Sequence, residues 1–282
     1  MKAMFWSAVE NGKVQCELCP INCVLSENQT GPCSTRINHG GQMEALQYGK
    51  IVACAIDPVE KKSLRKFHPG EMIYSIAGQG CNLHCAFCQN WQISQQCSSV
   101  TTEMSPEQVV QAAVESGSFG IAYTYSEPLV WYEFVHDTAK LAHKAGLENV
   151  LVTNGFINDE PLQKILPLID AANIDLKSIE DSFYRKICKA GVDPVKNTIR
   201  AMSNHGVHIE VTNLIIPGYN DSKEQVLGVV DFLADIDSKI PLHLSAYYPA
   251  YNFDAPRTSP DKIKSLVELA STRLENVYPG NI

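Results

Sequence analysis

Seven of the ten cysteines in this 282-residue chain fall into two groups with spacings typical of metal ligands. Cys81, Cys85 and Cys88 have the spacing C-x3-C-x2-C. An iron–sulfur cubane normally takes four cysteine ligands, so three thiolates here predict a cubane with one iron open to another molecule. A zinc site and buried cysteines without a metal are the alternatives for this group.

The second group lies earlier in the chain, where Cys16, Cys19, Cys23 and Cys33 have the spacing C-x2-C-x3-C-x9-C. Four thiolates without an open position suit a closed metal site. A zinc ion would organise this part of the chain. A second iron–sulfur cluster would instead act as an electron relay or lie beside the substrate, and cysteines without a metal are the third alternative.

The composition excludes several classes of protein. Hydrophobic residues make up 45% and charged residues 19% of the chain, as in an ordinary globular protein. The net charge of −8 argues against nucleic-acid binding through bulk positive charge. No apolar run is long enough to cross a membrane, and the first 13 residues lack the core of a signal peptide. We therefore expect a cytoplasmic protein with reduced cysteines.

Beyond about residue 70, short apolar runs alternate with helical patterns. The six expected strands cover residues 72–77, 120–124, 149–153, 171–176, 208–216 and 242–247. Helices are expected from Ser105 onward and over residues 129–145, 159–166, 181–189, 193–204, 222–234 and 260–273. This alternation predicts a parallel α/β sheet. Because six units are too few for a closed barrel, we expect a partial (β/α)6 barrel, with a flat doubly wound sheet as the competitor.

The first part of the chain has a different character. Residues 1–70 contain the earlier cysteine group and several glycines, and they predict a small metal-organised segment before a main domain over 71–282. The basic stretch Lys61–Lys66 is expected to be a solvated connector. Binding of a phosphate, an acidic substrate or a partner is the alternative for this stretch.

Other motifs accompany the later cysteine group, in order and at the ends of expected strands. They are Phe87 before the third cysteine, Tyr125-Ser126-Glu127-Pro128, Thr153-Asn154-Gly155, Asp175-Leu176-Lys177 and Ile215-Ile216-Pro217-Gly218. Together with the cysteines they resemble the radical S-adenosylmethionine (SAM) superfamily over residues 71–250. The last three motifs resemble the branch of the pyruvate-formate-lyase activating enzymes.

The resemblance implies an enzyme with a [4Fe–4S] cluster whose open iron binds SAM. The reduced cluster would cleave SAM to a 5′-deoxyadenosyl radical, which abstracts hydrogen from a substrate. That substrate is either a glycine of another protein, as for an activating enzyme, or a small molecule, and ferredoxin or flavodoxin would supply the electron. The alternative function is a non-catalytic iron–sulfur electron carrier or a zinc-organised binding protein.

The resemblance also implies roles for individual residues. Phe87 would lie near the adenine, and Glu127 or the backbone of residues 125–127 would accept a hydrogen bond from the SAM ammonium group. Lys177 would pair with a carboxylate, and Tyr248 would bond a ribose hydroxyl. The remaining cofactor-binding positions are Tyr125, Ser126, Asn154 and Asp175. Tyr125-Ser126 stands where the family has Gly-Gly. Because side chains here would keep SAM farther from the backbone than glycine does, we expect the methionine end of SAM to be bound differently.

Two further motifs resemble the radical SAM proteins of the AmmeMemoRadiSam system. They are Asp57-Pro58-Val59-Glu60-Lys61-Lys62 and Cys88-Gln89-Asn90-Trp91, and they accompany the Cys-x-Leu-Cys-Pro sequence at Cys16. That family is named for its genes, which lie beside genes for Memo-like and AMMECR-like proteins. The resemblance therefore implies such proteins as partners.

Overall fold

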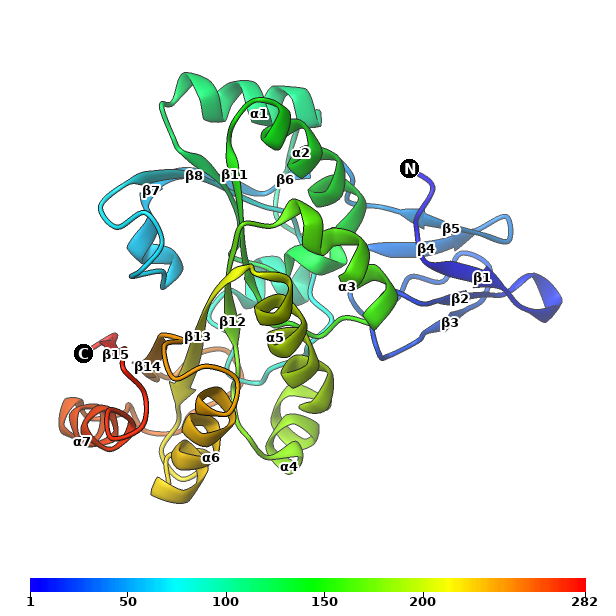
Figure 1. The fold of residues 1–282 in the computed structure, drawn as a ribbon. Helices are drawn as coiled ribbons and strands as arrows, with labels where there is room; N and C mark the ends of the chain where they lie inside the picture. Colours follow the sequence, from blue (N-terminus) through cyan, green and yellow to red (C-terminus); the bar gives the residue numbers. More distant parts are fainter.

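The computed structural model describes residues 1–282, and its centre is a curved sheet of eight strands in the order β15-β14-β13-β12-β11-β10-β8-β7 (Figure 1). The strands are β7 (Ala53–Pro58), β8 (Met72–Ala77), β10 (Gly120–Tyr123), β11 (Glu148–Thr153), β12 (Ala171–Asp175), β13 (His208–Ile215), β14 (Leu242–Ala246) and β15 (Val277–Gly280). All neighbours from β8 to β15 pair in parallel. This confirms the expected α/β fold with a mostly parallel sheet, consistent with a partial barrel.

Both edges of the sheet differ from the expectation. Strand β7 pairs antiparallel with β8, and β15 extends the parallel sheet beyond β14. Neither is among the six expected strands, and each contains a proline: Pro58 ends β7 and Pro279 lies within β15. An edge strand tolerates proline, since one side of its backbone has no partner strand.

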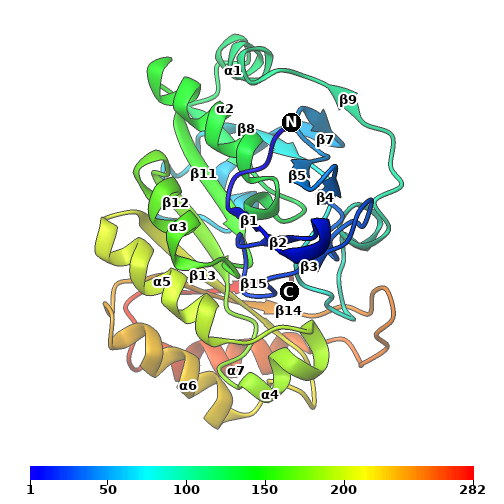
Figure 2. The ribbon, with the colours of Figure 1, turned by 90° about the vertical axis from the view of Figure 1, so that its right-hand side faces the viewer.

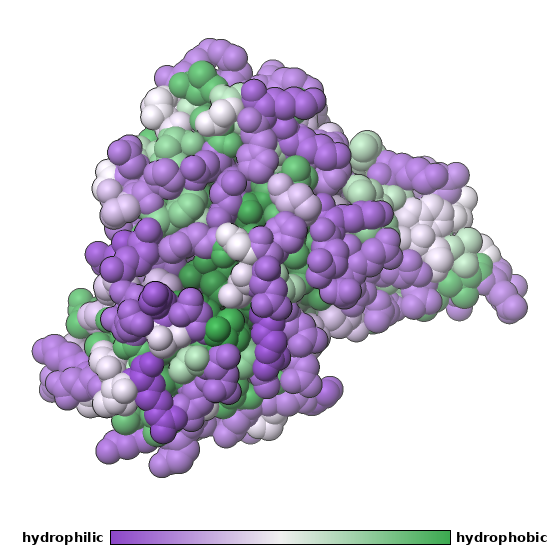
Figure 3. All heavy atoms as spheres, viewed as in Figure 1, coloured by the Kyte–Doolittle hydropathy of each residue, from purple (hydrophilic) through white to green (hydrophobic).

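The helices lie along the outer side of the sheet (Figures 1 and 2). They are α1 (Pro106–Glu115), α2 (Tyr132–Lys144), α3 (Asp159–Ile165), α4 (Asp181–Phe183), α5 (Asp193–His205), α6 (Lys223–Ala234) and α7 (Pro260–Ala270). Ser105 and Ser222 cap α1 and α6 by accepting from a backbone N–H of the first turn. The outer surface of the helices is largely hydrophilic, with hydrophobic residues visible in the seams between them (Figure 3). None of the helices has the length and apolar character needed to cross a bilayer.

The N-terminal segment forms small strands that project from one side of the sheet (Figure 1). They are β1 (Trp6–Ala8), β2 (Val14–Cys16), β3 (Val24–Leu25), β4 (Arg36–His39), β5 (Gln42–Ala45) and β6 (Lys50–Ile51), the last paired with β9 (Thr102–Glu103). Arg36 anchors the segment, because its buried Nη2 lies 2.5 Å from Oε1 of Glu133 on α2. The boundary near residue 70 stays a prediction, while β7, which precedes it, belongs to the central sheet.

Alternate residues of the strands face two separate cores. One face packs against the helices, and the inner face forms a small core that includes Ile73 of β8 and Val150 of β11. Val59 and Leu64, from the segment after β7, complete this inner core and are fully buried. The stretch Lys61–Lys66 is therefore not simply a solvated connector: Lys61, Arg65 and Lys66 are exposed, but the chain between them fills the inside of the barrel.

A buried carboxylate holds this segment against the strands. Oε1 of Glu210 on β13 accepts hydrogen bonds from the backbone N–H groups of Arg65 and Lys66, at 2.8 and 2.7 Å. His208 and His243 lie 3.1 and 2.6 Å from its two oxygens. Although burial opposes it, these hydrogen bonds lower the pKa of Glu210 to about 2.

We expect Glu210→Gln to lower the free energy of unfolding at pH 7 by about 2–3 kcal/mol. In the wild type the carboxylate charge strengthens the hydrogen bonds to the segment, and the neutral amide of the variant lacks this charge. The pKa of Glu210 falls from 4.5 to about 2 on folding, so this stabilisation is present above the unfolded pKa and is lost as the pH falls toward 2. The difference in free energy of unfolding between the wild type and the variant, measured by urea unfolding, should therefore be smaller at pH 3 than at pH 7. Glu268→Gln, at an exposed position of α7, is the control. A difference that does not change with pH would contradict the assignment.

Candidate active site

A cavity of about 370 Å³ lies inside the barrel, at the edge where the parallel strands end. Parallel strands bring their carboxyl ends to one edge, so the loops after β8, β10, β11 and β12 converge there. Ten of the eleven residues predicted for the cluster and SAM line this cavity: Cys81, Cys85, Phe87, Cys88, Tyr125, Ser126, Glu127, Asn154, Asp175 and Lys177.

Tyr248 is the predicted residue that does not line the cavity. Its hydroxyl donates to the carbonyl of Asn281, 3.0 Å away, and the Arg257 guanidinium lies 4.4 Å from its ring centre. Asn281 itself lines the cavity, so Tyr248 lies behind the wall. The predicted bond of Tyr248 to a ribose stays a prediction.

Glycine lets the loop after β8 bring the cysteines into place. Gly80 has φ +104, and a Cβ there would overlap the carbonyl oxygen of Cys33 and the methyl group of Thr35. The Gly80 carbonyl accepts from the backbone N–H of Glu127 at 3.2 Å, which joins this loop to the loop after β10. A side chain at Gly80 would therefore push Cys81 away from the cavity.

Each cysteine of the later group has a polar neighbour at its sulfur. Cys81 Sγ accepts from the Leu83 N–H at 3.4 Å and from Asn154 Nδ2 at 3.5 Å. Cys88 Sγ lies 3.1 Å from Ser94 Oγ. These groups would stabilise a charged sulfur in a buried place.

Cys85 has a neighbour from far along the chain in Cys188. Cys188 is fully buried, and its thiol lies beside Cys85 and lowers the pKa of the Cys85 thiol. The backbone fixes this contact, because the N–H groups of His84 and Ala86 donate to the carbonyls of Cys188 and Ile187. A single cysteine far along the chain carries no sequence signal of such a contact.

Glu127 is a structural centre of the site. Its Oε1 accepts from the Leu129 N–H at 2.9 Å and from the Thr153 hydroxyl at 2.6 Å, and its Oε2 accepts from the Asn154 N–H at 2.7 Å. The residue is only 2% exposed, and burial raises the pKa of its carboxyl to about 7. The carboxylate thus ties the loop after β10 to the loop after β11.

Lys177 and Phe87 lie together on another wall. Lys177 Nζ is 3.0 Å from Asp175 Oδ2 and 5.8 Å from the centre of the Phe87 ring. The ammonium group therefore has one carboxylate partner and one aromatic face beside it. Asp175 and Lys177 thus form a salt bridge with each other, and both residues also line the cavity.

The sequence interpretation missed a buried network at the cavity wall. Asp57 accepts from the Tyr125 hydroxyl at 2.5 Å and pairs with Lys62 at 2.7 Å and Lys61 at 3.1 Å. Although burial opposes it, these bonds hold the pKa of Asp57 well below its usual range. Tyr125 has φ +67, an unusual value for a residue with a side chain. The spacing of Lys61 four residues after Asp57 was the available signal, but a solvated face gives the same spacing.

The earlier group of cysteines surrounds a separate, closed and mostly apolar cavity. Cys16, Cys19, Cys23 and Cys33 all line it, so the structure brings the predicted set together. Nowhere in the chain do three cysteine, histidine or carboxylate side chains lie close enough together to share one metal ion. A cubane is larger than an ion, and it spans thiolates that stand farther apart.

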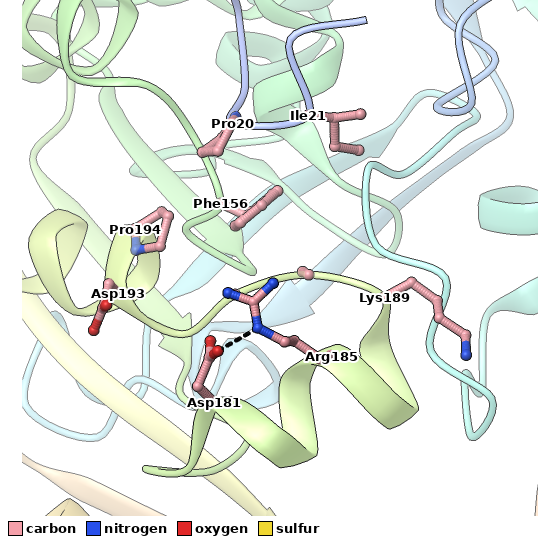
Figure 4. Close-up of a pocket in the computed structure, with 10 residues that line it drawn as sticks. Pro20, Ile21, Phe156, Asp181, Arg185, Lys189, Asp193 and Pro194 are labelled. Carbon is pink, nitrogen blue, oxygen red and sulfur yellow. Dashed lines mark hydrogen bonds and ion pairs between the residues drawn. The ribbon is translucent and has the colours of Figure 1, made fainter.

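A second hollow, of about 620 Å³, opens on the outside of the barrel (Figure 4). Pro20 and Ile21, between two of the early cysteines, lie across it from Arg185, which pairs with Asp181 at 2.5 Å. None of the residues predicted to bind a cluster or SAM lines this hollow. The inner cavity is therefore the candidate active site.

The chain has relatives of known and unknown activity. It is 42% identical to an uncharacterized protein from Methanocaldococcus jannaschii over 100% of this chain and 85% of that protein. It is 24% identical to a pyruvate formate-lyase-activating enzyme of Clostridium pasteurianum, over 60% of this chain and 73% of the enzyme. It is 23% identical to pyruvate formate-lyase 1-activating enzyme of Escherichia coli K12, over 60% of this chain and 72% of that enzyme.

Solved structures support the same fold. A radical SAM methyltransferase from Sphaerobacter thermophilus matches with a TM-score of 0.59 and 16% identity, over 76% of this chain and 67% of that one. QueE from Escherichia coli matches with a TM-score of 0.53 and 14% identity, over 84% and 95%. The sequence pattern of the radical SAM superfamily matches residues 75–233, more than half of the chain. A [4Fe–4S] cluster and SAM are implied by that match, and the chain belongs to the radical SAM superfamily.

Proposed function

We propose that this protein is an enzyme that cleaves SAM reductively at a [4Fe–4S] cluster held by Cys81, Cys85 and Cys88. The observation that carries the proposal is that these three cysteines line one cavity at the carboxyl edge of the sheet. The donor set fits the group, because three thiols with polar neighbours suit a cubane that leaves one iron for SAM. When bound, the cluster and SAM would supply a carbon-centred radical that removes a hydrogen atom from the substrate.

The protein residues would bind and orient SAM. Phe87 and Lys177 offer an aromatic face and a cation on one wall, which suits the adenine and a carboxylate. The Glu127 carboxylate already accepts three hydrogen bonds, so we assign it a positioning role. This favours the backbone of residues 125–127 as the acceptor for the ammonium group. Ser126 donates to the Gly78 carbonyl at 2.7 Å and helps to fix that backbone.

The wall formed by Asp57 and Tyr125 would help to exclude water from the cavity. Asp57 holds the Tyr125 hydroxyl and the Lys62 ammonium group, and Lys62 is only 2% exposed. Water exclusion protects a reactive radical from side reactions. A non-catalytic carrier has no need of such a cavity beside its cluster, so the cavity supports an enzyme over that alternative.

Hydrogen abstraction from a substrate agrees with the similarity to activating enzymes. The substrate is a protein glycine or a small molecule, and the cavity volume lies in the range of small-molecule sites. Ferredoxin or flavodoxin would be the reductant. The AmmeMemoRadiSam identity, with Memo-like and AMMECR-like partners, is part of the proposal and rests on the sequence motifs. A cytoplasmic location is also proposed, on the composition of the chain.

We expect simultaneous replacement of Cys81, Cys85 and Cys88 by Ala to abolish the formation of 5′-deoxyadenosine from SAM. The reason is that the variant lacks the thiolates that would hold the reactive cluster. The measurement is product analysis after anaerobic reconstitution with iron and sulfide and reduction with dithionite. Cys54→Ala, at an exposed cysteine, is the control and should retain activity. Formation of 5′-deoxyadenosine by the triple variant would refute the proposed ligands.

We expect Glu127→Gln to lower the free energy of unfolding by about 2 kcal/mol and to weaken SAM binding by about tenfold. The amide nitrogen of glutamine cannot accept the bonds that the carboxylate receives from neighbouring loops. Urea unfolding and equilibrium dialysis of SAM measure the two effects, with Glu268→Gln as the control. Unchanged stability with weaker SAM binding would instead mean that the Glu127 carboxylate contacts SAM directly.

A further inference from the structure

We propose that Cys16, Cys19, Cys23 and Cys33 hold a second [4Fe–4S] cluster, which receives electrons at the protein surface and passes them to the Cys81 site through Asn82. This inference rests on the proposed function, because it assumes a cluster at the Cys81 site. It assigns the early cysteines to an iron–sulfur cluster instead of zinc, and it gives that cluster a direction of electron flow.

The two cysteine groups are immediate neighbours. The carbonyl oxygen of Cys33 and the methyl group of Thr35 lie against the Cα of Gly80, the residue before Cys81. A second contact joins the loop after β11 to the early segment: the N–H of Asn158 donates to the carbonyl of Leu18 at 3.1 Å. Since Leu18 precedes Cys19 and Gly80 precedes Cys81, the two sites share a wall of backbone.

Two amide side chains bridge this wall. Asn154 Nδ2 donates to Asn82 Oδ1 at 2.9 Å and lies 3.5 Å from Cys81 Sγ. On its other side, the Asn82 side chain lies close enough to the Cys19 thiol to lower its pKa, against the larger effect of burial, which raises it. Asn82 Nδ2 also donates to the Phe156 carbonyl at 2.6 Å, and Asn82 is only 1% exposed. Asn82 is therefore held firmly, and the two amides lie between Cys81 and Cys19.

The donor set favours a cluster over a zinc ion. A tetrahedral zinc site brings four sulfurs to about 2.3 Å from one ion, which requires them to lie close together. In neither cysteine group do three thiols lie close enough together to bind one metal ion. All four early cysteines nevertheless line one closed cavity, and Arg36 Nη1 lies 4.0 Å from Cys16 Sγ. A cation beside a ligand sulfur offsets the negative charge of four thiolates on either kind of centre, so Arg36, which also pairs with Glu133, supports metal binding, and the spacing of the thiols favours the cluster.

The early site also reaches the outside of the molecule. Cys23 and Cys33 are partly exposed, whereas Cys16 and Cys19 are buried. Pro20 and Ile21, which lie between Cys19 and Cys23, border the outer hollow (Figure 4). A donor protein at this surface would lie beside the early site, and no residue of the outer hollow lines the substrate cavity.

The transfer balances with one electron and no bond change. A low-potential one-electron donor protein, a reduced flavodoxin or ferredoxin, would be oxidised by one electron. The early cluster would be reduced from its 2+ to its 1+ state, and it would return to 2+ as the Cys81 cluster becomes 1+. No proton or leaving group is involved.

Metal analysis tests the identity of the second centre. We expect the variant with Cys81, Cys85 and Cys88 replaced by Ala to retain, after anaerobic reconstitution, four iron and four sulfide per chain and an electron paramagnetic resonance signal on reduction. Zinc in place of iron, or no metal, would overturn the proposal. If the variant does not fold, the wild-type chain decides, since eight iron per chain supports a second cluster and four iron with one zinc overturns it. In the latter case the cluster of the proposed function would still stand.

Electron delivery tests the relay. We compare SAM cleavage driven by reduced flavodoxin with cleavage driven by dithionite, a small reductant that does not depend on protein docking, and use the ratio of the two rates. Replacing all four early cysteines by Ala should reduce this ratio to background. Asn82→Leu, which keeps all seven cysteines, should lower it by about an order of magnitude. A wild-type ratio in both variants would overturn the relay, whereas absence of dithionite-driven cleavage in the wild type would refute the proposed function itself.

Discussion

The inside of a curved sheet must be filled, and in this protein the segment after β7 fills it. Val59 and Leu64 close the inner core, and Glu210 binds the backbone that follows them. The end of β7 and the segment after it bring Asp57 and Lys62 to the loop after β10. The packing that completes the barrel thus also forms one wall of the active-site cavity, so stability and function depend on the same stretch of chain.

Buried charges are costly, and the site contains several that are fully bonded. Asp57 is surrounded by two ammonium groups and a phenol, and Glu127 accepts bonds from two backbone N–H groups and a hydroxyl. Because each of these carboxylates holds neighbouring loops in fixed positions, the cavity keeps its shape before any ligand binds. Such preorganisation suits a reaction in which a reactive species must be kept from water.

Local patterns predicted the six parallel strands, because strands buried on both faces are apolar along their whole length. Strand β15 and the two buried residues Val59 and Leu64 were missed, since short runs with proline or lysine nearby look like loops. The interpretation of Lys61–Lys66 as a solvated connector was incomplete for the same reason. The burial of Lys62 depends on Asp57 and Tyr125, and Tyr125 lies 63 residues away from it in the chain.

The sequence by itself determined the superfamily, through three cysteines in eight residues, and the order of strands that place them at one edge of a sheet. It also grouped the four early cysteines, because ligand spacing is a local property. Only the tertiary structure decided that the two groups lie back to back, with Gly80 against Cys33 and Asn82 between Cys19 and Cys81. These contacts join residues far apart in the chain, and their geometry follows from how the segments pack, which local spacing does not encode.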